Sequence, residues 1–165
     1  MTKLTSISLL ITIALILSLI EKMFPIFLFV PGAKLGLCNL VTLIAIYLFK
    51  NKRDVFKIIF IRVILSSFFG TNISSLIYSI TGALLSFLAM SFVKSKSSSI
   101  IYISIIGAIT HNIAQMVVAA IILENIYLIF YLPCLIIVAI ISGFFVGAVA
   151  KHTLYYLPLG LKEME

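Results

Sequence analysis

Apolar positions follow one another along this chain in long runs that are separated by short polar segments. Six such runs cover residues 4–20, 35–49, 55–69, 73–93, 100–123 and 126–150. A helix needs about 20 mostly apolar residues to cross the hydrocarbon core of a bilayer, with a range of roughly 17 to 25. Inside lipid the backbone groups must be paired within the segment, as they are in a helix. The pattern predicts an all-α protein with one integral membrane domain, a six-helix transmembrane bundle.

The sequence predicts where each span lies better than where it begins and ends. The second and third runs are short for a span, and only Glu124 and Asn125 separate the fifth run from the sixth, so we expect a tight turn there. The first run is longer than the apolar part of a typical secretory signal peptide, and no small-residue cleavage site follows it. We therefore interpret residues 4–20 as a first span that the protein keeps.

Composition and charge agree with a membrane location and suggest an orientation. The chain has 165 residues, of which 63% are hydrophobic and 10% are charged, whereas a soluble domain is about half apolar and about a quarter charged. Most of its 12 lysines and arginines fall on the side of both predicted termini, and only Lys22 and Lys34 fall on the other side. Basic residues concentrate on the cytoplasmic side of membrane proteins, so both termini are predicted to be cytoplasmic.

The segment between the first two spans, residues 21–34, is too short for another span and too apolar for a solvated loop. Glu21 and Lys22 begin it, Lys34 ends it, and two prolines enclose its apolar centre. Such a segment lies along the membrane interface or folds back over the bundle. Two interpretations stay open, a lid over an outward-facing pocket and an interfacial anchor.

One ionisable side chain falls inside a predicted span. Arg62 lies within "IIFIRVILSSFF", where no acidic residue is close in sequence. Charged groups inside membranes are costly, usually face the bundle interior, and often mark a site. Glu21 or Glu124 of another segment, exposed carbonyls, or an anionic ligand could compensate its charge. We favour a role for Arg62 in a binding site over a purely structural ion pair.

Three polar side chains interrupt the fifth run. His111 and Gln115 are four residues apart and share one face of a helix, and Asn112 lies about 100° around the helix from His111. They offer hydrogen-bond donors and acceptors without a fixed charge. The set could line a ligand pocket or clamp neighbouring helices together, and a clamp is the better interpretation for Asn112 alone.

Other polar and small residues complete the set of candidates. Asn39 and Lys34 lie near the predicted outer ends of the spans, and the pair Thr71-Asn72 could cap the fourth helix. Ala139, Gly143 and Gly147 form a small-residue stripe, for which helix packing within the chain is a better interpretation than a dimer face. Cys38 and Cys134 lack metal-ligand spacing, and neither a metal nor a cofactor is predicted.

Four segments resemble a known family. They are "PGAKLGLCNLVTLIAIY" (31–47), "RVILSSFFG" (62–70), "YSITGALLSFLAM" (78–90) and "SIIGAITHNIAQMVVA" (104–119). Together they resemble the Gx transporter family, whose members are commonly labelled heptaprenyl diphosphate synthase component I. These are small proteins of the bacterial cytoplasmic membrane that look like the substrate-binding S components of energy-coupling-factor vitamin transporters. The resemblance implies a substrate site at Glu21, Lys34, Asn39, Arg62, His111, Asn112 and Gln115.

Two functions follow from these observations. The first is a substrate-binding membrane subunit for uptake of a small vitamin-, flavin- or isoprenoid-like molecule, anionic or electron-rich, with energy supplied by partner proteins. The second is an accessory membrane subunit of an isoprenoid or quinone biosynthetic or redox complex. Prenyl-chain synthases hold Mg²⁺ through clustered aspartates because this cation prefers carboxylate oxygens, and Asp54 is the one aspartate of this chain. Catalysis by the chain alone is therefore not expected. Binding of nucleic acid is not expected either, because the basic residues flank the apolar runs and act as orientation signals.

Overall fold

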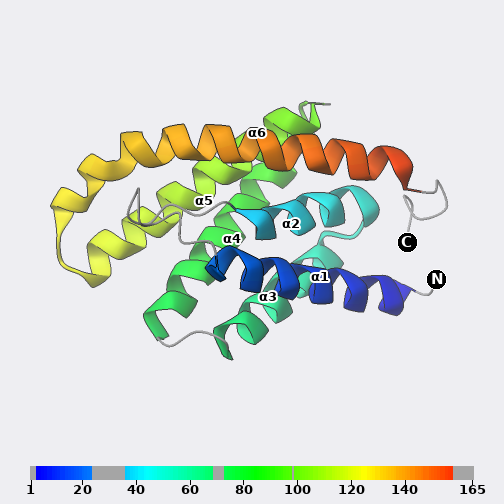
Figure 1. Cartoon of the computed structure of the whole chain (residues 1–165), viewed down its shortest axis with the longest axis horizontal. Coiled ribbons are helices and arrows are strands. Elements are labelled where there is room, and N and C mark those ends of the chain that lie inside the picture. The colour runs from blue at the N-terminus through cyan, green and yellow to red at the C-terminus, as the bar shows by residue number, and fades with distance from the viewer. Residues whose placement is uncertain (1–2, 24–35, 69–72, 98, 158–165) are drawn as a thin grey trace.

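The computed structural model describes residues 3–23, 36–68, 73–97 and 99–157, and these form helices joined by short connections (Figure 1). They contain six α-helices and one 3₁₀ helix: α1 (Lys3–Met23), α2 (Leu37–Leu48), α3 (Lys52–Phe68), α4 (Ile73–Lys94), α5 (Ile100–Ile122), η2 (Ile126–Tyr131) and α6 (Leu132–Tyr156). The prediction of an all-α protein is confirmed, and each of the six apolar runs contains one α-helix.

Four of the helical segments are long and apolar enough to cross a membrane. They are α1, α4, α5 and the continuous segment formed by η2 and α6. The 12 residues of α2 give a helix only about 18 Å long, shorter than the hydrocarbon core of about 30 Å. The chain thus has the helices of a membrane protein. Two of the six predicted spans, α2 and α3, are not among the helices that are long and apolar enough to cross a membrane by themselves.

The short helix α2 lies at the centre of the described part of the chain. It contacts α1, α3, α4, α5 and α6, and Figure 1 shows it between α1 and α6. All its residues from Val41 to Ile46 are buried. A helix that is buried on all sides is expected to be mostly apolar all round, and in α2 the buried polar side chains are those of Asn39 and Thr42. The other helices cover it and turn many large apolar side chains outward, as expected for helices in contact with lipid.

The helices α4, α5 and α6 pack closely through small residues. A Cβ atom added to Gly143 of α6 would lie 2.8 Å from the Cα atom of Ile105 on α5, and one added to Gly147 would lie 2.8 Å from Cα of Ile101. The backbones of α5 and α6 can approach this closely because glycine has no side chain. The interpretation of the small-residue stripe as packing within the chain is confirmed.

At the junction of α5 and α6 the predicted turn is present, but the sixth helix begins and ends later in the sequence than predicted. The tight turn at Glu124 and Asn125 is confirmed: Glu124 has φ +50°, and the Asn125 side chain accepts a hydrogen bond from the Tyr127 N–H at 3.0 Å. The sixth helix, however, does not run from Ile126 to Ala150. Residues 126–131 form the 3₁₀ helix, and α6 begins at Leu132 and continues to Tyr156.

Basic side chains gather where α1, α3 and α5 begin and where α2, α4 and α6 end, and we call this the basic end of the bundle. The Lys3 Nζ atom is 2.9 Å from a carboxylate oxygen of Asp54, and the Lys94 Nζ–H donates a hydrogen bond to the Ile46 carbonyl at 2.7 Å. In Figure 1 the start of α1 and the end of α6 both lie at the right of the view. The opposite end, where α1, α3 and α5 finish, we call the distal end.

Candidate functional site

The side chain of Arg62 is buried in the middle of α3. It is only 4% exposed, although the faces of the same helix on either side carry exposed residues such as Ile61 and Ile64. Among the described residues its Nε atom has no hydrogen-bond partner. Arginine stays charged in proteins, and a buried charge needs an opposite charge and hydrogen bonds around it. The position therefore requires compensating groups from neighbouring helices.

Side chains of α1 and α2 meet Arg62. The Arg62 guanidinium, the Ser18 hydroxyl of α1 and the Glu21 carboxylate of α1 all lie close enough to the Cys38 thiol of α2 to interact with it electrostatically. The Cys38 Sγ–H also donates to the Ala14 carbonyl, with an Sγ–O distance of 3.8 Å. We call Ser18, Glu21, Cys38 and Arg62 the Arg62 cluster. It joins three helices in the distal half of the bundle.

Glu21 also connects the end of α1 to the start of α2. Its Oε1 atom accepts a hydrogen bond from the Gly36 N–H at 2.6 Å. Gly36 has φ +71°, a left-handed conformation in which residues with a Cβ atom are strained. The carboxylate thus sits at the N-terminus of α2, where the helix dipole favours negative charge. Of the two acidic residues that the sequence offers as partners of Arg62, Glu21 is the one that shares the Cys38 thiol with it as an electrostatic neighbour, whereas Glu124 lies exposed in the turn after α5.

Asn39 and Lys34 differ in how far they can be described. Asn39 follows Cys38 on α2 and is 6% exposed, so its amide is buried. Lys34 lies outside the described residues, as do residues 24–33 of the predicted lid or anchor and the predicted helix cap at Thr71-Asn72. For these positions the sequence-based expectations stay predictions.

The three polar residues of α5 lie in two different interfaces. His111 and Gln115 face α4, where a Cβ atom added to Gly82 would lie 2.9 Å from the His111 Cε1 atom and 3.0 Å from the Gln115 Cγ atom. The Gln115 amide donates a hydrogen bond to the Tyr78 carbonyl of α4 at 3.4 Å. The buried Asn112 amide instead donates to the Leu135 carbonyl of α6 at 3.2 Å. Asn112 therefore ties α5 to α6, whereas His111 and Gln115 pack against α4.

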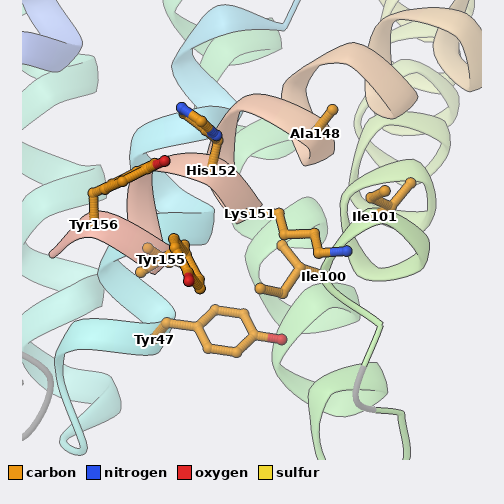
Figure 2. A pocket seen from close by; sticks show the side chains of 9 residues that line it. Tyr47, Ile100, Ile101, Ala148, Lys151, His152, Tyr155 and Tyr156 are labelled. Atoms are coloured by element: carbon orange, nitrogen blue, oxygen red, sulfur yellow. The ribbon is translucent and has the colours of Figure 1, made fainter.

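A cavity at the basic end was not predicted. It has a volume of about 730 Å³ and lies between the end of α2, the start of α5 and the end of α6 (Figure 2). Its walls are formed by Tyr47, Ile100, Ile101, Ala148, Lys151, His152, Leu154, Tyr155 and Tyr156. In the sequence, Lys151 and His152 are only two polar residues after the last apolar run. The signal that could have found the cavity is the cluster of two tyrosines, a histidine and a lysine within six residues, 151–156.

Metal binding has no support from the described part of the chain. No group of three His, Cys, Asp or Glu side chains comes together there in a way that could hold a metal ion. What the Arg62 cluster can do is bind an anion. A guanidinium with an unused N–H, buried among a thiol, a hydroxyl and a carboxylate, is suited to a carboxylate or phosphate group.

Comparison with known proteins identifies one family. Residues 10–153 match the family described as heptaprenyl diphosphate synthase component I. The match includes four helices that carry candidate residues, α1, α2, α3 and α5. No curated protein and no solved structure matches the chain.

Proposed function

The chain belongs to the heptaprenyl diphosphate synthase component I family, and from that premise we propose that it is a substrate-binding membrane subunit that holds a small anionic molecule at the Arg62 cluster. The observation that carries this proposal is the buried Arg62 guanidinium, whose Nε–H has no acceptor among the described residues. A purely structural arginine in a membrane interior is expected to have its donors paired. A ligand anion would complete the pairing.

The chemistry of the cluster defines the ligand group. A guanidinium presents its N–H groups in a planar fork that matches a carboxylate or a phosphate. In this proposal Glu21 and the entering anion share the compensation of the Arg62 charge. The buried amide of Asn39 is a predicted neutral donor and acceptor for the ligand. Lys34 and His111 stay predicted ligand contacts, whereas the hydrogen bonds from Asn112 to α6 and from Gln115 to α4 favour packing roles for these two residues.

The proposed topology follows from the two ends of the bundle. All six α-helices share the bilayer in this proposal, with α2 shielded at the centre, and the basic end faces the cytoplasm because Lys and Arg concentrate on that side. The Arg62 cluster then lies in the outer half, where it would receive a molecule from outside the cell. Vitamin-, flavin- and isoprenoid-like anions are the candidate substrates, and separate energising subunits would drive uptake.

The test is native mass spectrometry of the protein extracted gently from its own membrane. We expect a small anionic molecule to remain bound to the wild type and to be absent from the Arg62→Met variant. Arg53→Gln is the matched control, because Arg53 is an exposed arginine in the first turn of the same helix. Circular dichroism and size-exclusion chromatography would verify that all three proteins are folded. Retention of the same molecule by Arg62→Met would contradict the proposal.

The family name supports a second candidate, an accessory membrane component of a prenyl diphosphate synthase. In that case a catalytic subunit should co-purify in a fixed ratio, and the membrane protein should carry no small molecule at Arg62. The same preparation distinguishes the two functions, since one leaves a ligand in the spectrum and the other leaves a protein partner.

A further inference from the structure

The cavity at the basic end is separate from the Arg62 cluster and combines apolar walls with polar groups at one side. Ile100 and Ile101 of α5 and Leu154 of α6 supply apolar surface, and Tyr47 and Tyr155 add phenol rings. Figure 2 shows Lys151, Tyr155, Tyr47 and Ile100 arranged around the same space, whereas His152 and Tyr156 lie together at one side of it. A cavity of about 730 Å³ is within the size range of small-molecule sites.

The charges around this cavity are positive. Lys151 lines it, and the Lys94 Nζ atom lies 4.4 Å from the centre of the Tyr47 ring that forms part of its wall. None of the lining residues is acidic. Asp54, the acidic residue described at this end of the bundle, is already bridged by Lys3 and Lys57. The local field therefore favours an anion, and the phenol hydroxyls can donate hydrogen bonds to it.

The position of the cavity indicates what kind of anion fits. It opens where α2 and α6 end and α5 begins. In the proposed topology, on which this inference rests, this is the level at which helices leave the apolar interior for the headgroup region. Basic pockets between membrane helices at such a level bind phosphate-bearing headgroups. We propose that this cavity is a binding site for the phosphate headgroup of an amphiphile, with Lys151 and the hydroxyls of Tyr47 and Tyr155 at the phosphate and the isoleucines along the first part of the apolar chain.

A bilayer phospholipid and a single-chain prenyl diphosphate share this chemistry, and the experiment separates them. The protein is reconstituted in nanodiscs of neutral phosphatidylcholine, and either phosphatidylglycerol or farnesyl diphosphate is titrated in. Retained ligand is measured by native mass spectrometry. Inorganic diphosphate and farnesol serve as probes of the head and the chain alone. The variants are Lys151→Gln and Tyr47→Phe, and the control is Lys57→Gln, which removes an exposed lysine on α3 at the same end of the bundle.

We expect at least one of the two amphiphiles to bind more tightly than either fragment, and Lys151→Gln to weaken that binding about fivefold. Tyr47→Phe should weaken it less, and Lys57→Gln should leave it unchanged. The amphiphile that shows this pattern identifies the source of the phosphate. Equal losses in Lys151→Gln and Lys57→Gln would mean general attraction to the basic surface and would overturn the site, as would absence of binding by both amphiphiles. Arg62→Met should leave this binding intact, so the outcome is independent of the proposed substrate site.

Discussion

Two regions of this molecule bury polar side chains among apolar helices in different ways. The Arg62 cluster, between α1, α2 and α3, holds a fixed positive charge whose Nε–H has no acceptor among the described residues. The polar residues of α5 are neutral amides and an imidazole, and Asn112 and Gln115 donate to backbone carbonyls of α6 and α4. They lie where glycine lets the helices approach. The difference fits the proposed function, in which the first region accepts a further group, whereas the hydrogen bonds of the second region hold helices together.

The largest expected effect is the loss of ligand affinity when the charge of the Arg62 cluster is removed. Arg62→Met keeps a long unbranched side chain and removes the guanidinium. Because losing a charged hydrogen-bonding group from a buried contact costs about 2–5 kcal/mol of binding free energy, we expect ligand affinity to fall by about 100-fold or more. Titration of the molecule identified in the native preparation would measure this loss. A change below threefold would mean that Arg62 is part of the scaffold and that the two regions do not differ in function.

The second effect concerns the close packing of α5 and α6. In Gly143→Ala the new methyl group would meet the backbone of Ile105, which cannot move without separating the helices. Overpacking of this kind costs about 1–3 kcal/mol of unfolding free energy. In the matched variant Gly82→Ala the nearest atoms belong to the His111 ring and the Gln115 side chain, which can turn aside. Unfolding in a denaturing-detergent titration should therefore show a larger loss for Gly143→Ala, and the reverse order would contradict this description of the packing.

Asn112→Ala tests the packing role that we assign to the polar residues of α5. Removing the amide breaks its hydrogen bond to the Leu135 carbonyl. Such bonds between membrane helices contribute about 0.6 kcal/mol on average and at most about 1.7 kcal/mol. We expect a loss of stability in this range with unchanged ligand affinity, measured by the same unfolding titration and by ligand binding. A clear loss of affinity without a loss of stability would place Asn112 in a binding site.

The smallest effect is a pH dependence at the basic end. The Lys3 ammonium, which hydrogen-bonds Asp54, holds the pKa of this carboxyl below its ordinary value of 3.8, and Lys57 adds to the effect. Because the pKa is lowered in the folded protein, this stabilisation is present above pH 4 (about the unfolded pKa) and is lost as the pH falls further. Lys3 is 38% exposed, so the contribution should be below about 1 kcal/mol. Unfolding between about pH 3 and pH 6 should show it in the wild type, and Asp54→Asn should remove it.

Several parts of the fold were predictable because apolar runs of this length have few alternatives to a helix in lipid. The six runs, the turn at Glu124 and Asn125, and the packing role of Gly143 and Gly147 all follow from residue type and spacing. The ends of the helices did not: Ile126–Tyr131 is as apolar as a span, yet it forms a 3₁₀ helix before Pro133 in the first turn of α6. Hydrophobicity alone does not distinguish these two helical forms.

The sites were predictable only in part. A buried arginine stands out in any apolar run, but its neighbours Ser18 and Cys38 come from other helices and carry no special pattern of their own. The separation of Asn112 from His111 and Gln115 could not be read from spacing either, since it depends on which helices flank α5. The cavity at the basic end is formed by three helices that are distant in sequence, and its basic residues had a sufficient explanation as orientation signals.

The most direct test of the central claim compares the two polar regions in one experiment. The amount of endogenous small molecule retained by wild type, Arg62→Met and Gln115→Leu would be measured side by side by native mass spectrometry. We predict that Arg62→Met loses the molecule and that Gln115→Leu retains it. Loss in Gln115→Leu with retention in Arg62→Met would contradict the claim and would move the ligand site to the interface of α4 and α5.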